Sequence, residues 1–217
     1  MKKMLIMGLI TLAVTVYAAE WRWQIGPNLT FAFPDRKFAN VTEIGEGMGA
    51  KFTYNLKRHP WINPRFDVVY LSYGEKRSAV GFGNGYGFLI QTRNESFQIS
   101  AGLHIAKPNG KIRYYFSPMA GLFNYRAVTT LPELYYYYGF PYMDTHDSQT
   151  IWAARMQAGA LFDIGLGPLI DLALGYQRIF DVKTRVGEKM VSGDAQDLMV
   201  TVGLMIFSGK PKTREWR

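Results

Sequence analysis

The fold is decided by alternation, which is clearest in the stretch Ile170-Asp-Leu-Ala-Leu-Gly-Tyr-Gln177. The even-numbered residues of this stretch are large and apolar, whereas the odd-numbered ones are acidic, small or polar. A period of two residues indicates a β-strand, because successive side chains of a strand point to opposite faces of the sheet. This stretch is therefore predicted to be a strand with one purely apolar face.

The same alternation recurs along the chain and predicts an all-β protein. Helical periodicity is hard to find, and 22 glycines, 14 tyrosines and 14 phenylalanines are typical of a sheet-rich chain. We expect eight antiparallel strands, at residues 21–33, 47–56, 65–70, 97–105, 112–122, 152–163, 170–177 and 198–206.

The N-terminus, residues 1–18, has the layout of a secretory signal peptide. An apolar stretch follows two lysines, and the small residues Val16 and Ala18 fit a cut after Ala18 or, less well, after Ala19. A single anchor helix is the alternative. The chain contains no cysteine, so it must be stable without disulfides.

The net charge of +8 does not indicate a nucleic-acid partner. Two lysines belong to the signal peptide, and residues 208–217, the predicted periplasmic tail, carry four cations and one anion. The charge left on residues 20–207, the predicted barrel domain, is spread thinly. A nucleic-acid-binding protein would concentrate its basic residues in a patch, so we expect no such partner.

The connections are expected to alternate between short and long links, as they do in outer-membrane barrels. Short links are predicted at 57–63, 107–110 and 165–167, and long links at 34–43, about 75–95, 127–150 and 181–195.

Turn chemistry predicts the register of three hairpins. A two-residue turn at Pro108-Asn109 pairs Ile105 with Ile112, a three-residue turn at 165–167 pairs Phe162 with Ile170, and a turn at Asn84-Gly85 pairs Phe66 with Leu103. Each pairing joins two residues of apolar faces. The Asn84-Gly85 turn also implies that its two strands reach about Phe82 and Tyr86. Each arm then has about twenty residues, about twice what a bilayer requires.

Alternation alone fits either a soluble β-protein or a membrane barrel. A bilayer is favoured because the apolar faces are almost pure and the opposite faces are rich in Gly, Ala, Ser and Thr. Aromatic residues also gather at the strand ends: Trp21, Trp23, Tyr54, Trp61 and Tyr114 on the short-link side, and Tyr70, Trp152 and Tyr176 towards the long links. We predict an eight-stranded antiparallel up-and-down transmembrane β-barrel, with a soluble exported sandwich or lipocalin-like barrel as the alternative.

The final strand reads Leu198-Met-Val-Thr-Val-Gly-Leu-Met-Ile-Phe207. With the signal peptide and eight alternating strands, it resembles the small bacterial outer-membrane barrels, the OmpA/OmpX-like outer membrane protein β-barrel group. That resemblance implies a location in the bacterial outer membrane, a monomer, and recognition of the last strand by the assembly machinery through Gly203, Ile206 and Phe207. Two departures are the ten residues after Phe207 and its inward parity.

The predicted interior faces carry charged residues that must be paired or hydrated. They are Arg22, Lys51, Arg65, Asp67, Arg113, Arg155, Asp163 and Asp171. We expect an ion-pair network that closes the lumen, and the alternative is a charged eyelet for anions. The chain would then be a non-enzymatic envelope protein acting through external loops, or else a narrow porin-like channel.

Two further sets of residues are candidates for contacts outside the lumen. Arg126 and Arg178, helped by Lys183 and Arg185, are expected to bind lipopolysaccharide head groups, because arginine donates bidentately to phosphate. A tyrosine-rich loop is a candidate for recognition through Tyr135, Tyr136, Tyr137, Tyr138, Phe140 and Tyr142. The only acid, His and Ser cluster surrounds His146, and three neighbours in one loop are a poor catalytic triad. We expect no enzyme, cofactor or metal site.

Overall fold

A computed structural model describes residues 23–35, 39, 42–56, 59–82, 86–131, 142–144, 148–165, 168–186 and 189–207. The predicted signal peptide and basic tail lie outside these residues. The strands are β1 (Trp23–Pro34), β2 (Gly45–Tyr54), β3 (Ile62–Phe82), β4 (Tyr86–Ala106), β5 (Ile112–Leu131), β6 (Tyr142–Asp144), β7 (Ser148–Asp163), β8 (Leu169–Val186) and β9 (Lys189–Phe207). Within the described residues, no helix is long and apolar enough to cross a membrane.

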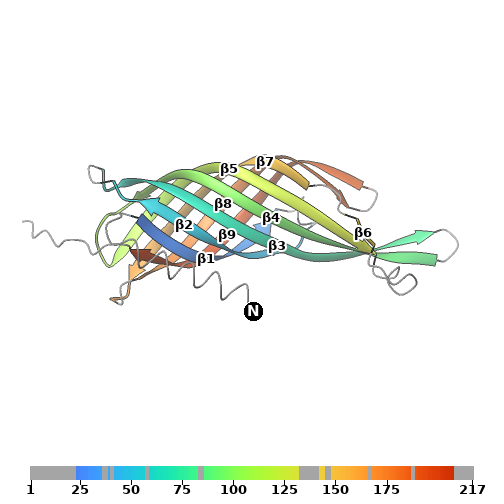
Figure 1. Cartoon of the computed structure of the whole chain (residues 1–217), viewed down its shortest axis with the longest axis horizontal. Coiled ribbons are helices and arrows are strands. Elements are labelled where there is room, and N and C mark those ends of the chain that lie inside the picture. The colour runs from blue at the N-terminus through green and yellow to red at the C-terminus, as the bar shows by residue number, and fades with distance from the viewer. Residues whose placement is uncertain are drawn as a thin grey trace, which may run out of the picture.

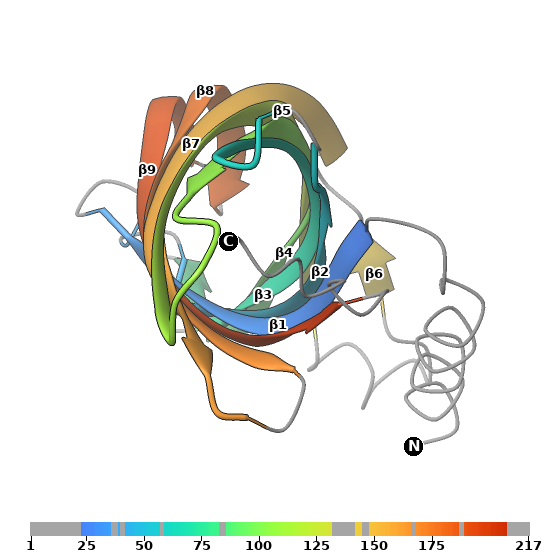
Figure 2. The ribbon, with the colours of Figure 1, turned by 90° about the vertical axis from the view of Figure 1, so that its left-hand side faces the viewer.

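The strands close into a ring, which Figure 2 shows end-on. Their order is β4-β3-β2-β1-β9-β8-β7-β5, and pairing of β4 with β5 closes the barrel. All of these pairings are antiparallel, and the three-residue β6 only extends the pairing of β5. The predicted fold class, an eight-stranded antiparallel up-and-down barrel, is confirmed.

The two faces of the barrel are inverted relative to a soluble protein. Large apolar side chains point outwards, and Leu174 is 59% exposed whereas Asp67 is 1% exposed. Similarly exposed residues include Leu29, Phe66, Phe97, Ile99, Phe116, Met156, Leu172, Leu198 and Leu204. The buried side chains include many polar ones, such as Gln24, Thr30, Ser96, Gln98 and Thr201. A soluble barrel has its apolar residues inside, so this distribution is that of a barrel surrounded by lipid.

Of the three predicted registers, one is confirmed and two are wrong. Phe162 pairs with Ile170, as the turn at 165–167 predicted. Ile105 pairs with Phe116 rather than with Ile112. The turn there is wider than predicted. The last backbone hydrogen bond between the two strands is donated by Lys107 N to Tyr114 O, so residues 108–113 form the turn. Both partners of Ile105 lie on the same face, so the error shifts the register without inverting the strand.

The hairpin between β3 and β4 also departs from the predicted register. Phe66 pairs with Ala101 rather than with Leu103. Phe82 pairs with Tyr86, so three residues separate the strands instead of two, and a bulge between Ser72 and Glu75 shifts the register again. At the bulge Gly74 has a φ of 72°, a left-handed conformation that glycine adopts without strain.

The predicted length of this hairpin is confirmed. Strands β3 and β4 have 21 residues each, against the 9 to 11 that a tilted strand needs to cross a bilayer. The neighbouring strands stop earlier, because the last rung between β2 and β3 is Glu46 with Ser72, and the last between β4 and β5 is Gln91 with Thr130. The hairpin therefore projects beyond the barrel, as Figure 1 shows.

Candidate functional site

The centre of the lumen holds a triad of charged side chains. Arg65 and Asp67 lie two residues apart on β3 and therefore share its inner face. Arg65 donates from Nε to Asp67 Oδ1 at 2.8 Å and from Nη2 to Asp67 Oδ2 at 2.7 Å. Arg155 of β7 donates to the same carboxylate from Nη2. The three side chains are between 1% and 7% exposed, so these charges are paired out of contact with bulk water.

A second ion pair lies beside the first group. Lys51 of β2 donates from Nζ to Asp171 Oδ2 of β8 at 2.5 Å, and both side chains are buried. The other oxygen of this carboxylate accepts a hydrogen bond of 2.7 Å from the Tyr115 hydroxyl of β5. Both carboxylate oxygens are therefore satisfied, which a buried ion pair requires.

Neutral side chains complete the network around Arg65. Its Nη1 donates to Ser117 Oγ at 2.9 Å, and its Nη2 donates to Gln157 Oε1 at 2.6 Å. Its guanidinium lies 5.6 Å from the centre of the Tyr115 ring. His104 Nδ1 lies 3.1 Å from Ser117 Oγ. Sequence reasoning did not assign Tyr115, Ser117 and Gln157 to the network, although their interior parity was the signal that could have done so.

These interactions cross the lumen instead of following its wall. In the order of strands around the barrel, β3 and β7 are three places apart, and so are β2 and β8. Asp67 with Arg155 joins the first pair of strands, and Lys51 with Asp171 joins the second. The interior of an eight-stranded barrel is just wide enough for side chains to fill it. Paired side chains that meet in its middle therefore occupy the passage.

Two of the predicted network residues lie elsewhere, and a third falls outside the described residues. Arg113 and Asp163 approach each other at 3.8 Å at the short-turn end of the barrel, where their side chains are 20% and 39% exposed. They are not part of the central network, because they lie at the very start of β5 and end of β7. Arg22 falls among the residues that the structure does not describe.

The lumen is less polar than the sequence indicated. Towards the projecting hairpin, an apolar cluster fills the interior with Ala32, Val69, Leu71, Tyr73, Phe123, Tyr125, Ala127, Ile179, Val182, Ala195 and Met199. Towards the short turns lies a smaller cluster of Ala106, Tyr115, Leu161, Leu169, Ala173 and Met205. The ion pairs therefore lie between two apolar layers, which further reduces access for ions.

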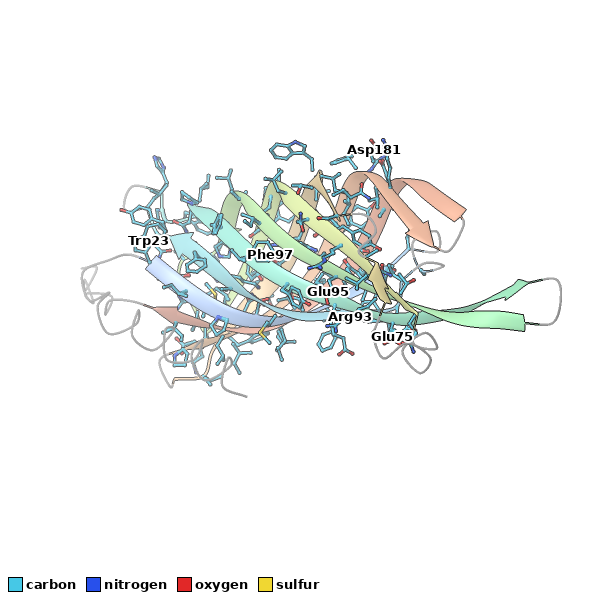
Figure 3. The ribbon with its side chains drawn as sticks, turned by 45° about the vertical axis from the view of Figure 1, so that its right-hand side comes forward. Trp23, Glu75, Arg93, Glu95, Phe97 and Asp181 are labelled. Carbon is cyan, nitrogen blue, oxygen red and sulfur yellow. The ribbon has the colours of Figure 1, made fainter. Side chains whose placement is uncertain are left out.

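Charged residues form a collar at the hairpin end of the apolar outer surface. Along β4 the outward residues change from Phe97 to Glu95 and Arg93, which are labelled in Figure 3. Arg93 Nε lies 2.9 Å from Glu95 Oε1, so the two side chains form an ion pair. Arg93 pairs across the sheet with Glu75. Glu95 pairs across it with the exposed Arg126. The collar marks where the apolar surface ends, whereas Trp23 lies at the opposite end of the barrel in Figure 3.

The collar continues on the strands β8 and β9. Arg178 donates to Asp194 Oδ2 from Nε at 2.9 Å and from Nη2 at 2.5 Å. These hydrogen bonds hold the pKa of the exposed Asp194 carboxyl below its ordinary value. Lys183 Nζ lies 3.6 Å from Asp181 Oδ2. Figure 3 shows Asp181 and Glu75 toward the same end of the barrel, the end from which the hairpin projects.

Comparison with solved structures places this geometry among known barrels. Neisserial surface protein A matches 85% of this chain and 95% of its own, with 13% identity and a TM-score of 0.51. Small outer-membrane barrels of this kind share the closed ring of eight antiparallel strands. The chain has the fold of the small outer-membrane β-barrels.

Other outer-membrane barrels align less closely. Ail of Yersinia pestis, in complex with the heparin analogue sucrose octasulfate, has 14% identity, coverage of 85% of this chain and 96% of its own, and a TM-score of 0.47. The N-terminal β-barrel domain of OprF from Pseudomonas aeruginosa has 13% identity, coverage of 84% and 97%, and a TM-score of 0.42. No protein-family model matches the chain, and no curated protein matches its sequence.

In this outer-membrane barrel fold, the four predicted head-group cations are not equivalent. Arg126 is exposed in the collar. Arg178 is held by Asp194, and its guanidinium lies 5.5 Å from the centre of the Phe180 ring. Lys183 has Asp181 beside it, and the side chain of Arg185 is not among those described. Arg178 and Lys183 therefore each lie beside an acidic side chain.

The last strand of the outer-membrane barrel closes the ring against the first. Ile206 pairs with Ile25, and Phe207 pairs with Gln24, which faces the lumen. The register therefore places Phe207 opposite a residue of the inner face. A Cβ atom at Gly203 would lie 2.7 Å from Pro27 O, so glycine permits the close approach of β9 to β1.

The remaining predicted site residues fall largely outside the described part of the outer-membrane barrel. Tyr135, Tyr136, Tyr137, Tyr138, Phe140 and His146 are among the residues that the structure does not describe. Tyr142 begins β6 and pairs with Leu131. Among the described residues, no group of three His, Cys, Asp or Glu side chains could hold a metal ion.

Proposed function

We propose that this chain is an integral outer-membrane protein whose barrel is closed to ions, and that it acts through its external surface without catalysing a reaction. The inverted distribution of apolar and polar side chains supports the location in lipid. The projecting hairpin supports a role above the membrane. Either envelope structure or contact with a surface ligand fits such a protein.

The observation that carries this proposal is the set of ion pairs across the lumen. Asp67 of β3 forms ion pairs with both Arg65 of the same strand and Arg155 of β7. Lys51 of β2 forms an ion pair with Asp171 of β8, across the lumen from it. Opening a passage would separate buried opposite charges, and breaking such a pair costs about 3–5 kcal/mol. A porin-like channel, the alternative from the sequence, would need a water-lined path in their place.

Two measurements test the location and the closure. In the first, bacteria expressing the chain are fractionated, and the outer-membrane fraction is compared on gels before and after boiling. A heat-dependent shift in mobility is expected.

In the second measurement, liposomes containing the folded chain are diluted into solutions of small sugars, and their swelling is followed by light scattering. Swelling no faster than in protein-free liposomes is expected, and rapid size-dependent swelling would favour a channel.

We propose in addition that the projecting hairpin presents a contact surface, together with the predicted recognition loop at residues 135–142. The hairpin is supported by strand pairing out to Phe82 and Tyr86, although β2 and β5 no longer flank it there. A variant in which a short turn replaces residues 76–92 should still fold and show heat-dependent mobility. Binding of whole cells to host matrix should fall, and unchanged binding would exclude the hairpin from this role.

The collar is proposed to contact lipopolysaccharide head groups through Arg126 and Arg178, with Lys183 and Arg185 nearby. Support comes from the exposed position of Arg126 just beyond the apolar surface. The test compares folding into bilayers with and without lipopolysaccharide for the double variant Arg126→Gln and Arg178→Gln. Lys111→Gln, an exposed cation at the opposite end, is the control. An unchanged lipid effect in the double variant would contradict the proposal.

A further inference from the structure

Three neighbouring residues inside the barrel share an unusual feature. Arg155 of β7 pairs directly with Gln177 of β8, and Gln177 pairs with Asp197 of β9. Their side chains face the interior, and the residues are 6%, 2% and 1% exposed. Arg155 Nε, Gln177 Nε2 and Asp197 Oδ1 are buried and make no hydrogen bond within the described part of the chain. The only other such atom among the described residues is Asn28 Nδ2.

The central network by itself carries an unbalanced charge. The central network contains three cations, Lys51, Arg65 and Arg155, but only the two acids Asp67 and Asp171. Asp197 lies apart from it, within the apolar cluster between Ala195 and Met199 on β9. Its Oδ2 accepts a hydrogen bond of 3.1 Å from the Tyr73 hydroxyl. With Asp197 included, the buried Lys, Arg and Asp charges of the described residues balance.

We propose that Arg155, Gln177 and Asp197 form an internal water-binding site, and that the bound water joins Arg155 and Asp197 into a water-bridged ion pair. The free atoms are two N–H donors and one carboxylate acceptor. Water can accept from the donors and donate to the carboxylate, whereas an anion would face Asp197 and a cation would face Arg155. Buried polar atoms of this kind are commonly satisfied by internal water, which makes about three hydrogen bonds.

The spacing of the strands fits this assignment. Neighbouring strands lie about 4.8 Å apart, so the backbones of Arg155 and Asp197 are separated by about 10 Å. The Arg155 guanidinium is bound to Asp67, and it makes no direct hydrogen bond with Asp197. Gln177 lies halfway and can orient one or two waters between the charged groups. Asp197 then supplies the missing negative charge of the central network without leaving the apolar cluster.

The site extends the hydrogen-bonded network towards the outer end of the lumen. From Tyr73 the network would run through Asp197, the bound water and Arg155 to Asp67, and from there to Arg65 and Ser117. This inference rests on the closed lumen proposed above, because the water is held in place and does not flow. The water site thus continues the hydrogen-bonded network through the apolar cluster on the hairpin side of the lumen, as far as Tyr73.

A double-mutant cycle in lipid bilayers tests the bridge. The variants are Arg155→Met, Asp197→Asn and their combination, and the measured quantity is the folding equilibrium constant from urea titration. The loss caused by Arg155→Met should be smaller in the Asp197→Asn background by roughly fivefold or more, since the residues share a network. Gln177→Leu should remove that difference. Asp163→Asn, at an exposed position that shares no described partner with Arg155, is the control and should leave it unchanged.

A second measurement uses the unaltered chain and stays informative if a variant fails to fold. In lipid nanodiscs, NMR cross-peaks between long-lived water and both the Arg155 Nε–H and the Gln177 side-chain amide are expected. Absence of these cross-peaks, or additive effects in the cycle, would overturn the water site. Coupling without bound water would indicate a direct Gln177–Asp197 bond and would also overturn it. Rapid sugar uptake with intact cross-peaks would instead refute only the closed lumen.

Discussion

At the scale of single residues, Asp67 is the carboxylate on which the central network depends. It accepts hydrogen bonds from Arg65 and Arg155, and it is 1% exposed. Asp67→Ala leaves two buried guanidinium groups without their acid, so we expect the free energy of unfolding in lipid vesicles to fall by about 3–5 kcal/mol. Asp163→Ala removes a half-exposed acid and should cost about 1 kcal/mol or less. Equal losses in urea titrations of the two variants would contradict the assigned role.

Residue parity accounts for most of what the sequence could predict about the site. Arg65, Asp67, Lys51, Arg155 and Asp171 lie on interior faces as expected, and the structure brings them together. Which residues meet across the lumen depends on the stagger of strands around the closed barrel, and no local pattern encodes this. The same limit explains why the sequence did not show that Arg113 and Asp163 meet each other at the short-turn end of the barrel, away from the central network.

Apolar interior residues were the other part that sequence reasoning missed. Leu71, Tyr73, Phe123 and Tyr125 lie on the parity of the polar face, yet they are fully buried. Their outward neighbours Ser72, Asn124 and Arg126 are polar, so hydrophobicity no longer distinguishes the two faces of these strands near the hairpin end. The interior of the barrel must be filled, but apolar and polar side chains can both fill it. Its polarity therefore changes from the apolar clusters at the two ends to the ion pairs between them.

At the scale of strands, interior glycines set how closely β4 and β5 approach. A Cβ atom at Gly121 would lie 2.0 Å from Ile99 O, so Gly121→Val must push the two strands apart. Overpacking of this kind typically costs about 1–3 kcal/mol. Ala120→Val, at the neighbouring exposed position on the outer face, should be nearly neutral. Unfolding free energies in vesicles that decrease equally for both variants would show that close strand approach is not the cause.

Turns were less predictable than strands for a physical reason. The register across the turn after β7 was predicted correctly, and Asp163 Oδ1 accepts a hydrogen bond of 2.9 Å from Gly165 N at its start. The turn after β4 spans residues 108–113 instead of two residues, and Arg113 Nε donates to Gly110 O across it at 3.2 Å. A dipeptide fixes a tight turn only when the strands reach it. Here the strands pair only as far as Lys107 and Tyr114, so the turn extends past Asn109 by the four residues 110–113.

At the scale of the whole molecule, the outer surface and the lumen make separate demands on one chain. The apolar outer surface ends at the collar that contains Arg93 and Glu95, so the barrel has a defined position in a bilayer. A short turn in place of residues 76–92 removes only structure beyond this collar. We expect such a variant to keep the unfolding free energy of the parent within about 1 kcal/mol, and a larger loss in vesicles would show that the hairpin supports the barrel.

The central claim is that paired side chains close the lumen, and single-channel recording tests it most directly. The folded chain is inserted into planar bilayers in concentrated potassium chloride, beside the variant Asp67→Ala combined with Arg155→Ala, in which the pair across the lumen is missing. We predict that the unaltered chain gives no stepwise current and that the variant, which lacks that pair, gives brief openings. Stable, uniform current steps from the unaltered chain, increasing with salt concentration, would contradict the account.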